Sequence, residues 1–150
     1  MTTTDLAALD VLLVEDDPGD VLMVREVFED HAVGGHLDVV SDGAEALAFL
    51  RREGEHADAR RPDVVLLDLN LPKIGGREVL EVVKADDELR SIPVVVLTTS
   101  AAEEDILRAY AAHANAYVTK PVDWDAFTAA VRRIGHFFGD VARLPRPARG

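Results

Sequence analysis

The chain of 150 residues contains no cysteine, which excludes disulfide bonds, thiolate metal sites and cysteine nucleophiles. Positive charge is also scarce, because 16 lysines and arginines stand against 28 acidic residues and give a formal net charge of -12. Such a chain has no electrostatic affinity for nucleic acid or for an anionic membrane surface. Residues 1–10 lack the positive charge and the apolar core expected of a signal peptide, and no apolar run approaches membrane-spanning length. We therefore expect one cytoplasmic domain that binds neither nucleic acid nor a membrane.

Polar residues stand at the carboxyl ends of four short apolar runs, which cover residues 11–14, 64–67, 94–97 and 116–118. These polar residues are Glu15, Asp16, Asp68, Thr98 and Lys120. A fifth apolar run covers residues 37–40, and the segments between the runs have helical periodicity. Strands that alternate with helices predict a parallel sheet with both faces covered.

The predicted fold is an α/β, doubly wound, five-stranded parallel sheet of the flavodoxin-like type, with strand order 2-1-3-4-5 and five helices. Ligands bind such sheets where the strand order reverses, here between strands one and three. Those strands end at Glu15, Asp16 and Asp68. Two carboxylates about 5 Å apart repel by about 3 kcal/mol at an effective dielectric constant of about 20, so the cluster requires a cation. Mg²⁺ suits a site of few carboxylates better than Ca²⁺ does.

Helix boundaries can also be predicted from the sequence. Asp17 and Pro18 suit the N-cap and first position of the first helix, and Ser41 suits the N-cap of the second. The charged stretch 51–62 has no periodicity and predicts a surface insertion.

Several motifs of the chain resemble those of receiver domains of two-component response regulators. They are Val-Glu-Asp-Asp-Pro at 14–18, Leu-Leu-Asp-Leu-Asn-Leu-Pro at 66–72, Val-Leu-Thr-Thr-Ser at 96–100 and Tyr-Val-Thr-Lys-Pro at 117–121. The resemblance covers residues 10–138 and leaves a tail at 1–9 and an extension at 139–150. It is strongest to single-domain regulators that work with phytochrome histidine kinases, through residues 49–52, 97–100 and the insertion at 51–62.

The resemblance implies that Asp68 takes a phosphoryl group from a sensor histidine kinase, here a bacteriophytochrome. It implies Mg²⁺ on Asp16, Asp68 and the backbone carbonyl of Asn70, with Glu15 acting through water. The protein would then be no enzyme beyond its own phosphotransfer and autodephosphorylation.

The resemblance also assigns a switch to Thr98, Lys120 and Tyr117. Thr98 and Lys120 would bind the phosphoryl group, and Tyr117 would turn inward in response. A cis peptide bond before Pro121 would aim the lysine at the site.

The output of the chain is expected to pass through another protein, because the twelve residues after 138 are too few for an effector domain. A homodimer and onward phosphotransfer are the other routes. Phe137, Val141 and Leu144 form an apolar stripe at helical spacing, which favours a homodimer surface over a tail folded back on its own domain.

Three other functions share parts of this pattern. A phosphorylation-independent receiver scaffold would need no chemistry, but every motif residue is present. A small Mg²⁺-dependent phosphohydrolase of the haloacid dehalogenase type carries a second aspartate where this chain has Asn70. A flavodoxin-like nucleotide-binding module needs a glycine- or hydroxyl-rich phosphate loop, whereas residues 16–20 are acidic.

Overall fold

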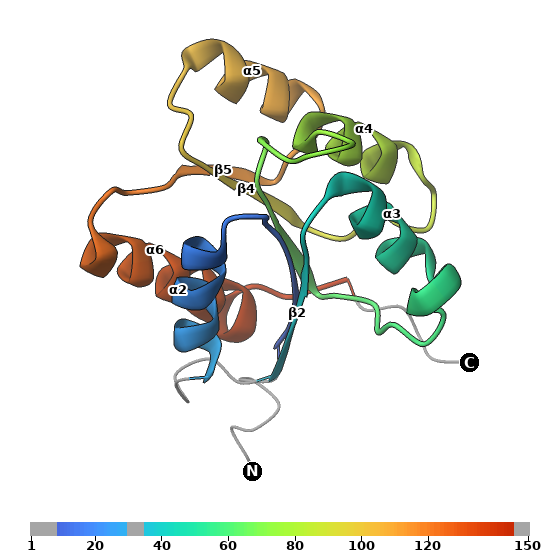
Figure 1. Ribbon diagram of the computed structural model, residues 1–150, viewed down its shortest axis with the longest axis horizontal. Helices are drawn as coiled ribbons and strands as arrows, with labels where there is room; N and C mark the ends of the chain where they lie inside the picture. Colours follow the sequence, from blue (N-terminus) through green and yellow to red (C-terminus); the bar gives the residue numbers. More distant parts are fainter. Residues whose placement is uncertain (1–8, 30–34, 146–150) are drawn as a thin grey trace.

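The computed structural model describes residues 9–29 and 35–145, which form one parallel five-stranded sheet between two layers of helices (Figure 1). The strands are β1 (Leu9–Val14), β2 (Gly35–Val40), β3 (Val64–Leu67), β4 (Val94–Thr98) and β5 (Ala116–Thr119). Their spatial order is β2-β1-β3-β4-β5, which confirms the predicted order. The predicted tail at 1–9 lies outside the described residues except for Leu9, which begins β1.

Five α-helices cover the two faces of the sheet in the described ranges. They are α2 (Pro18–Glu29), α3 (Gly43–Arg51), α4 (Gly76–Ala85), α5 (Glu103–Ala111) and α6 (Trp124–His136). Figure 1 shows α2 and α6 together on one face and α3, α4 and α5 on the other. None of the helices in the part of the chain described here has the length and apolarity needed to cross a membrane.

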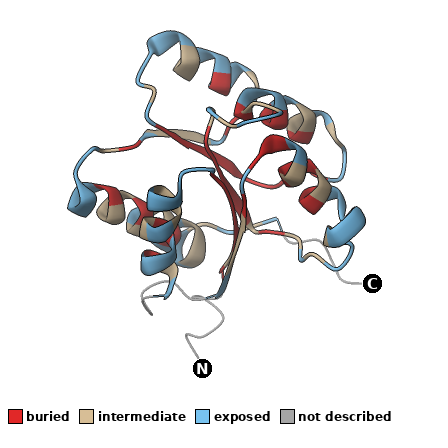
Figure 2. Ribbon diagram, in the orientation of Figure 1, coloured by how far each residue is buried: buried red, intermediate tan, exposed pale blue. Residues whose placement is uncertain are grey.

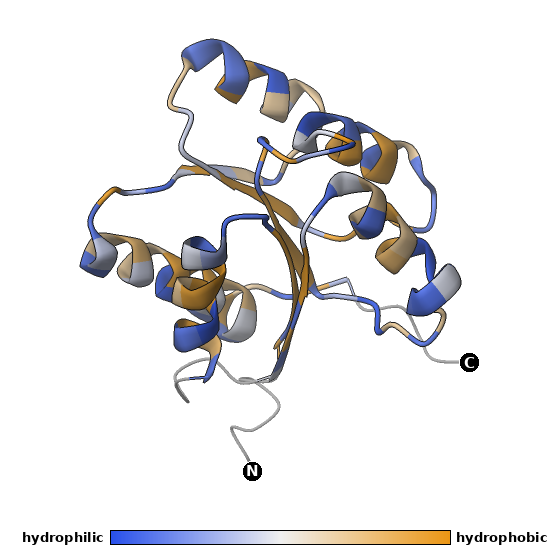
Figure 3. Ribbon diagram, viewed as in Figure 1, coloured by the Kyte–Doolittle hydropathy of each residue, from blue (hydrophilic) through white to orange (hydrophobic). Residues whose placement is uncertain are grey.

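Alternation along the central strands separates the core into two apolar clusters. Leu12 and Val14 of β1 face α3 and α4, whereas Val11 and Leu13 face α2 and α6. Because both faces are covered, β3 is fully buried along its length, and Figure 2 shows buried residues concentrated in the central strands. Figure 3 shows the same strands as the most apolar part of the chain. The sheet therefore gives its carboxyl-terminal edge a rigid support.

The start of α2 agrees with the prediction, and the start of α3 corrects it. The Asp17 carboxylate accepts the Gly19 N–H at 3.2 Å, and α2 begins at Pro18. The N-cap of α3 is Asp42 and not Ser41, because the Asp42 carboxylate accepts the Glu45 N–H at 2.7 Å while its backbone is extended. Ser41 lies one residue too early and is exposed.

The segments after α3 and α6 each contain a short helical turn, and the one after α3 was not predicted from the sequence. The insertion at 51–62 contains a 3₁₀ turn at Gly54–His56, and His56 packs on Phe49 with ring centroids 5.3 Å apart. The last helix continues beyond α6 as a π-helical turn at Phe137–Val141, so helical structure passes the predicted domain end at 138.

Candidate functional site

Three carboxylates meet at the carboxyl-terminal edge of the sheet. Glu15 and Asp16 follow β1 and Asp68 follows β3, and these strands are paired so that Val14 stands opposite Leu67. One oxygen from each carboxylate lies within 4.8 Å of the others. Glu15 and Asp68 are buried and Asp16 is exposed, so the cluster has one side open to solvent. Oxygen ligands of this kind, few in number and next to water, fit a hard divalent cation.

Burial perturbs the Glu15 carboxylate. Removal from water raises the pKa of Glu15 to about 7, although hydrogen bonding and attraction to Lys120 act in the opposite direction. The nearby Asp68 charge adds to the increase. A cation bound by the cluster would lower this cost, which is a further sign that the site suits one.

The Lys120 side chain reaches into this cluster from the end of β5. Its Nζ donates to Glu15, to Asp20 at 2.7 Å and to Asp68 at 3.0 Å. Burial alone would lower the pKa of Lys120, but the hydrogen bonds to the three carboxylates hold it above its ordinary value. The ammonium group is therefore charged and held beside Asp68.

Two details of this lysine differ from the sequence analysis. The peptide bond before Pro121 is trans, so the expected cis bond was wrong, and Lys120 points inward without it. An X-Pro bond differs little in energy between its two isomers. The contact with Asp20 was missed altogether, because an acidic residue in the first turn of a helix is ordinarily explained by the helix dipole.

The segment after Asp68 orients its carboxylate. The Asn70 N–H donates to Asp68 Oδ1 at 3.0 Å, which orients the carboxylate. Gly76 begins α4 directly against this segment, since a Cβ on Gly76 would lie 2.1 Å from the Asp68 carbonyl oxygen. The Asn70 residue itself is exposed beside the cluster.

The Thr98 hydroxyl at the end of β4 is buried without a partner. Thr98 is 0% exposed, and Oγ1 makes no hydrogen bond within the described part of the chain. A buried hydroxyl without a partner costs about 1–3 kcal/mol. Its neighbour Thr99, the other hydroxyl at this strand end, is exposed. The Thr98 hydroxyl is therefore a hydrogen-bond donor for which the described part of the fold supplies no acceptor.

Tyr117 lies partly buried on β5 and is linked to the loop after β4. Its hydroxyl donates to the Ser100 carbonyl at 2.8 Å, and Ser100 Oγ donates to Asp105 of α5 at 2.6 Å. Burial raises the pKa of the Tyr117 hydroxyl. The loop that follows Thr98 is thus connected at Ser100 to Tyr117 of β5 and to Asp105 of α5.

The predicted dimer stripe is divided by the π-helical turn. Phe137 is 51% exposed and Val141 is 69% exposed, and Phe138 packs edge-to-face on Phe137. Leu144 instead packs against the apolar cluster beneath α2 and α6. The helix ends at Val141, so the i, i+7 spacing assumed for Leu144 does not hold. The exposed apolar surface at this end is reduced to Phe137 and Val141.

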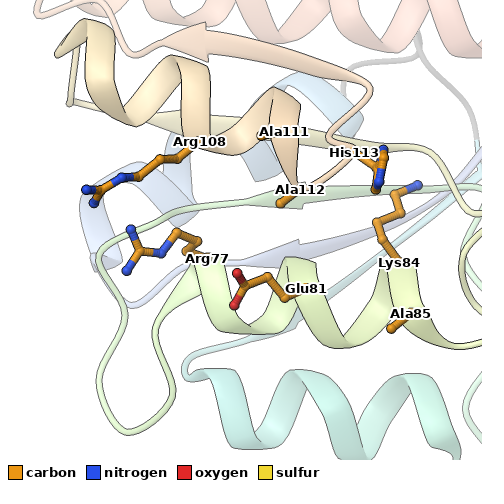
Figure 4. Close-up of a pocket in the computed structure, with 8 residues that line it drawn as sticks. All are labelled: Arg77, Glu81, Lys84, Ala85, Arg108, Ala111, Ala112 and His113. Carbon is orange, nitrogen blue, oxygen red and sulfur yellow. The ribbon is translucent and has the colours of Figure 1, made fainter.

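A separate groove lies between α4 and α5 (Figure 4). It encloses about 620 Å³, and Arg77 and Arg108 line it together with Glu81. An adjoining groove of about 350 Å³ reaches Asn70 and adds the acidic side chains of Glu78 and Asp105. The mixed charges favour no ligand class.

Comparison with known proteins gives a consistent set of relatives. The model of the response regulator receiver domain matches residues 11–132. The response regulator Rcp1 of Synechocystis is 42% identical over 135 residues, which cover 90% of this chain and 92% of Rcp1.

Two solved structures match over nearly their full length. The phosphorylated cyanobacterial phytochrome response regulator RcpA has a TM-score of 0.90 and 45% identity, covering 93% of this chain and 100% of RcpA. The Mn²⁺-bound form of Rcp1 has a TM-score of 0.88 and 41% identity, covering 92% of this chain and 99% of Rcp1.

Proposed function

The chain belongs to the family of response regulator receiver domains, and we propose that Asp68 is its phosphoacceptor in a two-component phosphorelay. One observation carries the proposal: the buried Asp68 carboxylate, the Lys120 ammonium and the unpartnered Thr98 hydroxyl converge on one edge of the sheet. The carboxylate is a nucleophile, the ammonium supplies positive charge and the hydroxyl supplies a hydrogen bond.

The reaction is a transfer of one phosphoryl group from a phosphohistidine. An Asp68 oxygen attacks phosphorus, the new O–P bond forms, and the N–P bond breaks with its electron pair returning to the imidazole nitrogen. Such transfers pass through a loose transition state, in which positioning and neutralisation of the phosphoryl oxygens matter most. The Asn70 N–H holds the Asp68 carboxylate in place for the attack.

Mg²⁺ is the cation proposed for the acidic cluster. Glu15, Asp16 and Asp68 would hold it together with the Asn70 backbone carbonyl. When bound, it would neutralise phosphoryl oxygen charge beside the acceptor. Lys120 would supply further positive charge beside the acceptor, because its Nζ lies 3.0 Å from Asp68 Oδ2.

Thr98 and Tyr117 are proposed to carry the signal away from Asp68. A phosphoryl group brings a charge of about -1.5 to -2 near neutral pH, and a hydrogen bond to a charged group contributes about 1.5–3 kcal/mol. Changing a two-state equilibrium from 1:99 to 99:1 takes about 5.5 kcal/mol, so two or three such bonds suffice. Closure of Thr98 on the phosphoryl group would move the Ser100 carbonyl that Tyr117 binds. The surface of α5, β5 and α6 would change with it.

The proposed chemistry is limited to the chain's own phosphorylation and autodephosphorylation. A phosphohydrolase of the haloacid dehalogenase type needs an acid two residues after the nucleophile, and this position holds the amide Asn70. The chain therefore lacks the residue that serves as acid and base in that family. The chain is proposed to signal through protein contacts.

The proposed partner is a histidine kinase of the phytochrome class, and the chain would work in the cytoplasm beside it. Support comes from the relatives that carry phytochrome response regulator in their names. A homodimer through Phe137 and Val141 is proposed as a further partner, because both side chains are exposed and apolar.

Phosphotransfer tests the proposed function. An autophosphorylated bacteriophytochrome kinase and an unrelated histidine kinase are each mixed with the protein, and loss of label from the kinase is followed over time. Faster transfer from the phytochrome kinase to the wild type, absent in Asp68→Asn, is the expected result. Equal transfer from both kinases would contradict the phytochrome assignment, and no transfer from either would favour the phosphorylation-independent scaffold.

A further inference from the structure

Asp20 is the third carboxylate on Lys120 and has no place in the acidic metal cluster. Its Oδ2 lies 2.7 Å from Lys120 Nζ, closer than the oxygen of Asp68. The cluster that could hold a cation comprises Glu15, Asp16 and Asp68, so among the residues described Asp20 is the lysine's carboxylate partner outside it. The two residues are in contact although they lie 100 positions apart in the sequence.

The beginning of α2 directs Asp20 toward the site. Asp20 is the third helical residue, a position from which an acidic side chain commonly reaches back to the backbone N–H of the N-cap residue. Here the Asp17 N–H donates to Glu15 Oε2 at 3.2 Å instead. Asp20 therefore does not cap the helix. Its side chain is 17% exposed and contacts Lys120. Ordinary helix stabilisation does not require this contact.

A cation in the cluster would weaken the hold of the other two carboxylates on the lysine. Glu15 and Asp68 would share their charge with the cation, and the cation would repel the ammonium group. The Lys120 side chain is only 4% exposed, so water cannot replace the lost partners. Asp20 lies outside the cluster, so it would not be shared with the cation and would stay bound to the lysine.

We propose that Asp20 is a positioning residue that holds the Lys120 ammonium over Asp68 while the metal and the phosphoryl group occupy the site. The inference rests on the proposed phosphoacceptor function of Asp68. It predicts that Asp20 supports the rate of phosphoryl transfer and leaves metal binding nearly unchanged.

Asp20→Asn is the test variant, and Asp17→Asn is its matched control. Both remove one negative charge from the same helix start, but Asp17 is exposed and its carboxylate accepts the Gly19 N–H. Mg²⁺ affinity is measured by calorimetry, and the phosphorylation rate is measured at saturating Mg²⁺ with a small-molecule phosphodonor. We expect Asp20→Asn to slow phosphorylation about tenfold, with Mg²⁺ affinity within about twofold of Asp17→Asn. Asp20→Glu should restore part of the rate.

Two results would overturn the inference while leaving the proposed function intact. One is equal phosphorylation rates in Asp20→Asn and Asp17→Asn. The other is a crystal structure of the wild type with Mg²⁺ and beryllofluoride in which Lys120 has left Asp20. That structure also covers the case in which Asp20→Asn does not fold. A wild type that accepts no phosphoryl group would overturn the inference and the proposed function together.

Discussion

Replacing Thr98 by valine should stabilise the unphosphorylated protein while removing its response to phosphate. The Thr98 hydroxyl is fully buried and has no hydrogen-bond partner in the described structure. Leaving such a group unsatisfied costs about 1–3 kcal/mol, and valine replaces the hydroxyl with a methyl group on the same branched frame. For a domain of this size, 1 kcal/mol corresponds to about 2–4 °C in melting temperature. We expect Thr98→Val to melt at least about 2 °C above the wild type.

The phosphate mimic should stabilise the wild type more than it stabilises Thr98→Val. Beryllofluoride with Mg²⁺ gives the Thr98 hydroxyl an acceptor in the wild type, and Thr98→Val cannot make that bond. The increase in melting temperature on adding the mimic should therefore be smaller in Thr98→Val than in the wild type.

Thr99→Val is the matched control for this prediction. It removes the exposed neighbouring hydroxyl. The melting temperatures with and without the mimic should each stay within about 1 °C of the wild-type values, as is usual for surface substitutions. Calorimetric scans of the three proteins with and without the mimic give all six values. The reasoning is refuted if Thr98→Val melts below the wild type without the mimic, or if the mimic raises both melting temperatures equally.

Three further predictions concern the support of the site and the assembly of the chain. Asp42→Ala should lower the free energy of unfolding by about 1 kcal/mol, and Asp42→Asn should lower it less. The pKa of Asp42 is held below its ordinary 3.8, chiefly by the Glu45 N–H, so this contribution is present above pH 3.8 and lost as the pH falls through the lowered pKa. Urea unfolding should show the Asp42→Ala deficit shrinking in acid, and a constant deficit would be inconsistent with it. Gly76→Ala should destabilise by about 1–3 kcal/mol and slow phosphorylation, because its Cβ would lie 2.1 Å from the Asp68 carbonyl oxygen, whereas Gly75→Ala finds only an ordinary contact at 3.9 Å. Similar urea midpoints for Gly76→Ala and Gly75→Ala would show that the backbone at Asp68 can shift to make room for the added Cβ. Phe137→Glu should bring the mass in light scattering to the 16.3 kDa of one chain, while Leu22→Glu, at another exposed apolar side chain, should not. An unchanged mass would count against the dimer.

The strand ends and the residues that meet there could be predicted because they depend on backbone topology. A parallel sheet brings the carboxyl ends of its strands to one edge whatever the surrounding side chains do. Glu15, Asp68 and Lys120 therefore meet as expected. The order of the strands follows from the same topology and the handedness of the connections.

The details that sequence reasoning missed depend on side-chain geometry and helix ends. Asp20 is free to contact Lys120 because the Asp17 N–H binds Glu15. No local sequence pattern predicts that hydrogen bond. Asp42 displaced Ser41 as N-cap by a shift of one residue, which is within the usual uncertainty of a helix boundary. Leu144 left the predicted stripe because the helix closes in a π turn before reaching it.

The central claim is that Asp68 accepts a phosphoryl group, and intact-mass spectrometry tests it most directly. The protein is incubated with Mg²⁺ and a small-molecule phosphodonor, beside Asp68→Asn and a sample stripped of metal by a chelator. The account predicts a mass increase of one phosphoryl group in the wild type with Mg²⁺, and no increase in the other two. An adduct that persists in Asp68→Asn, or a wild type that gains no mass, would contradict it.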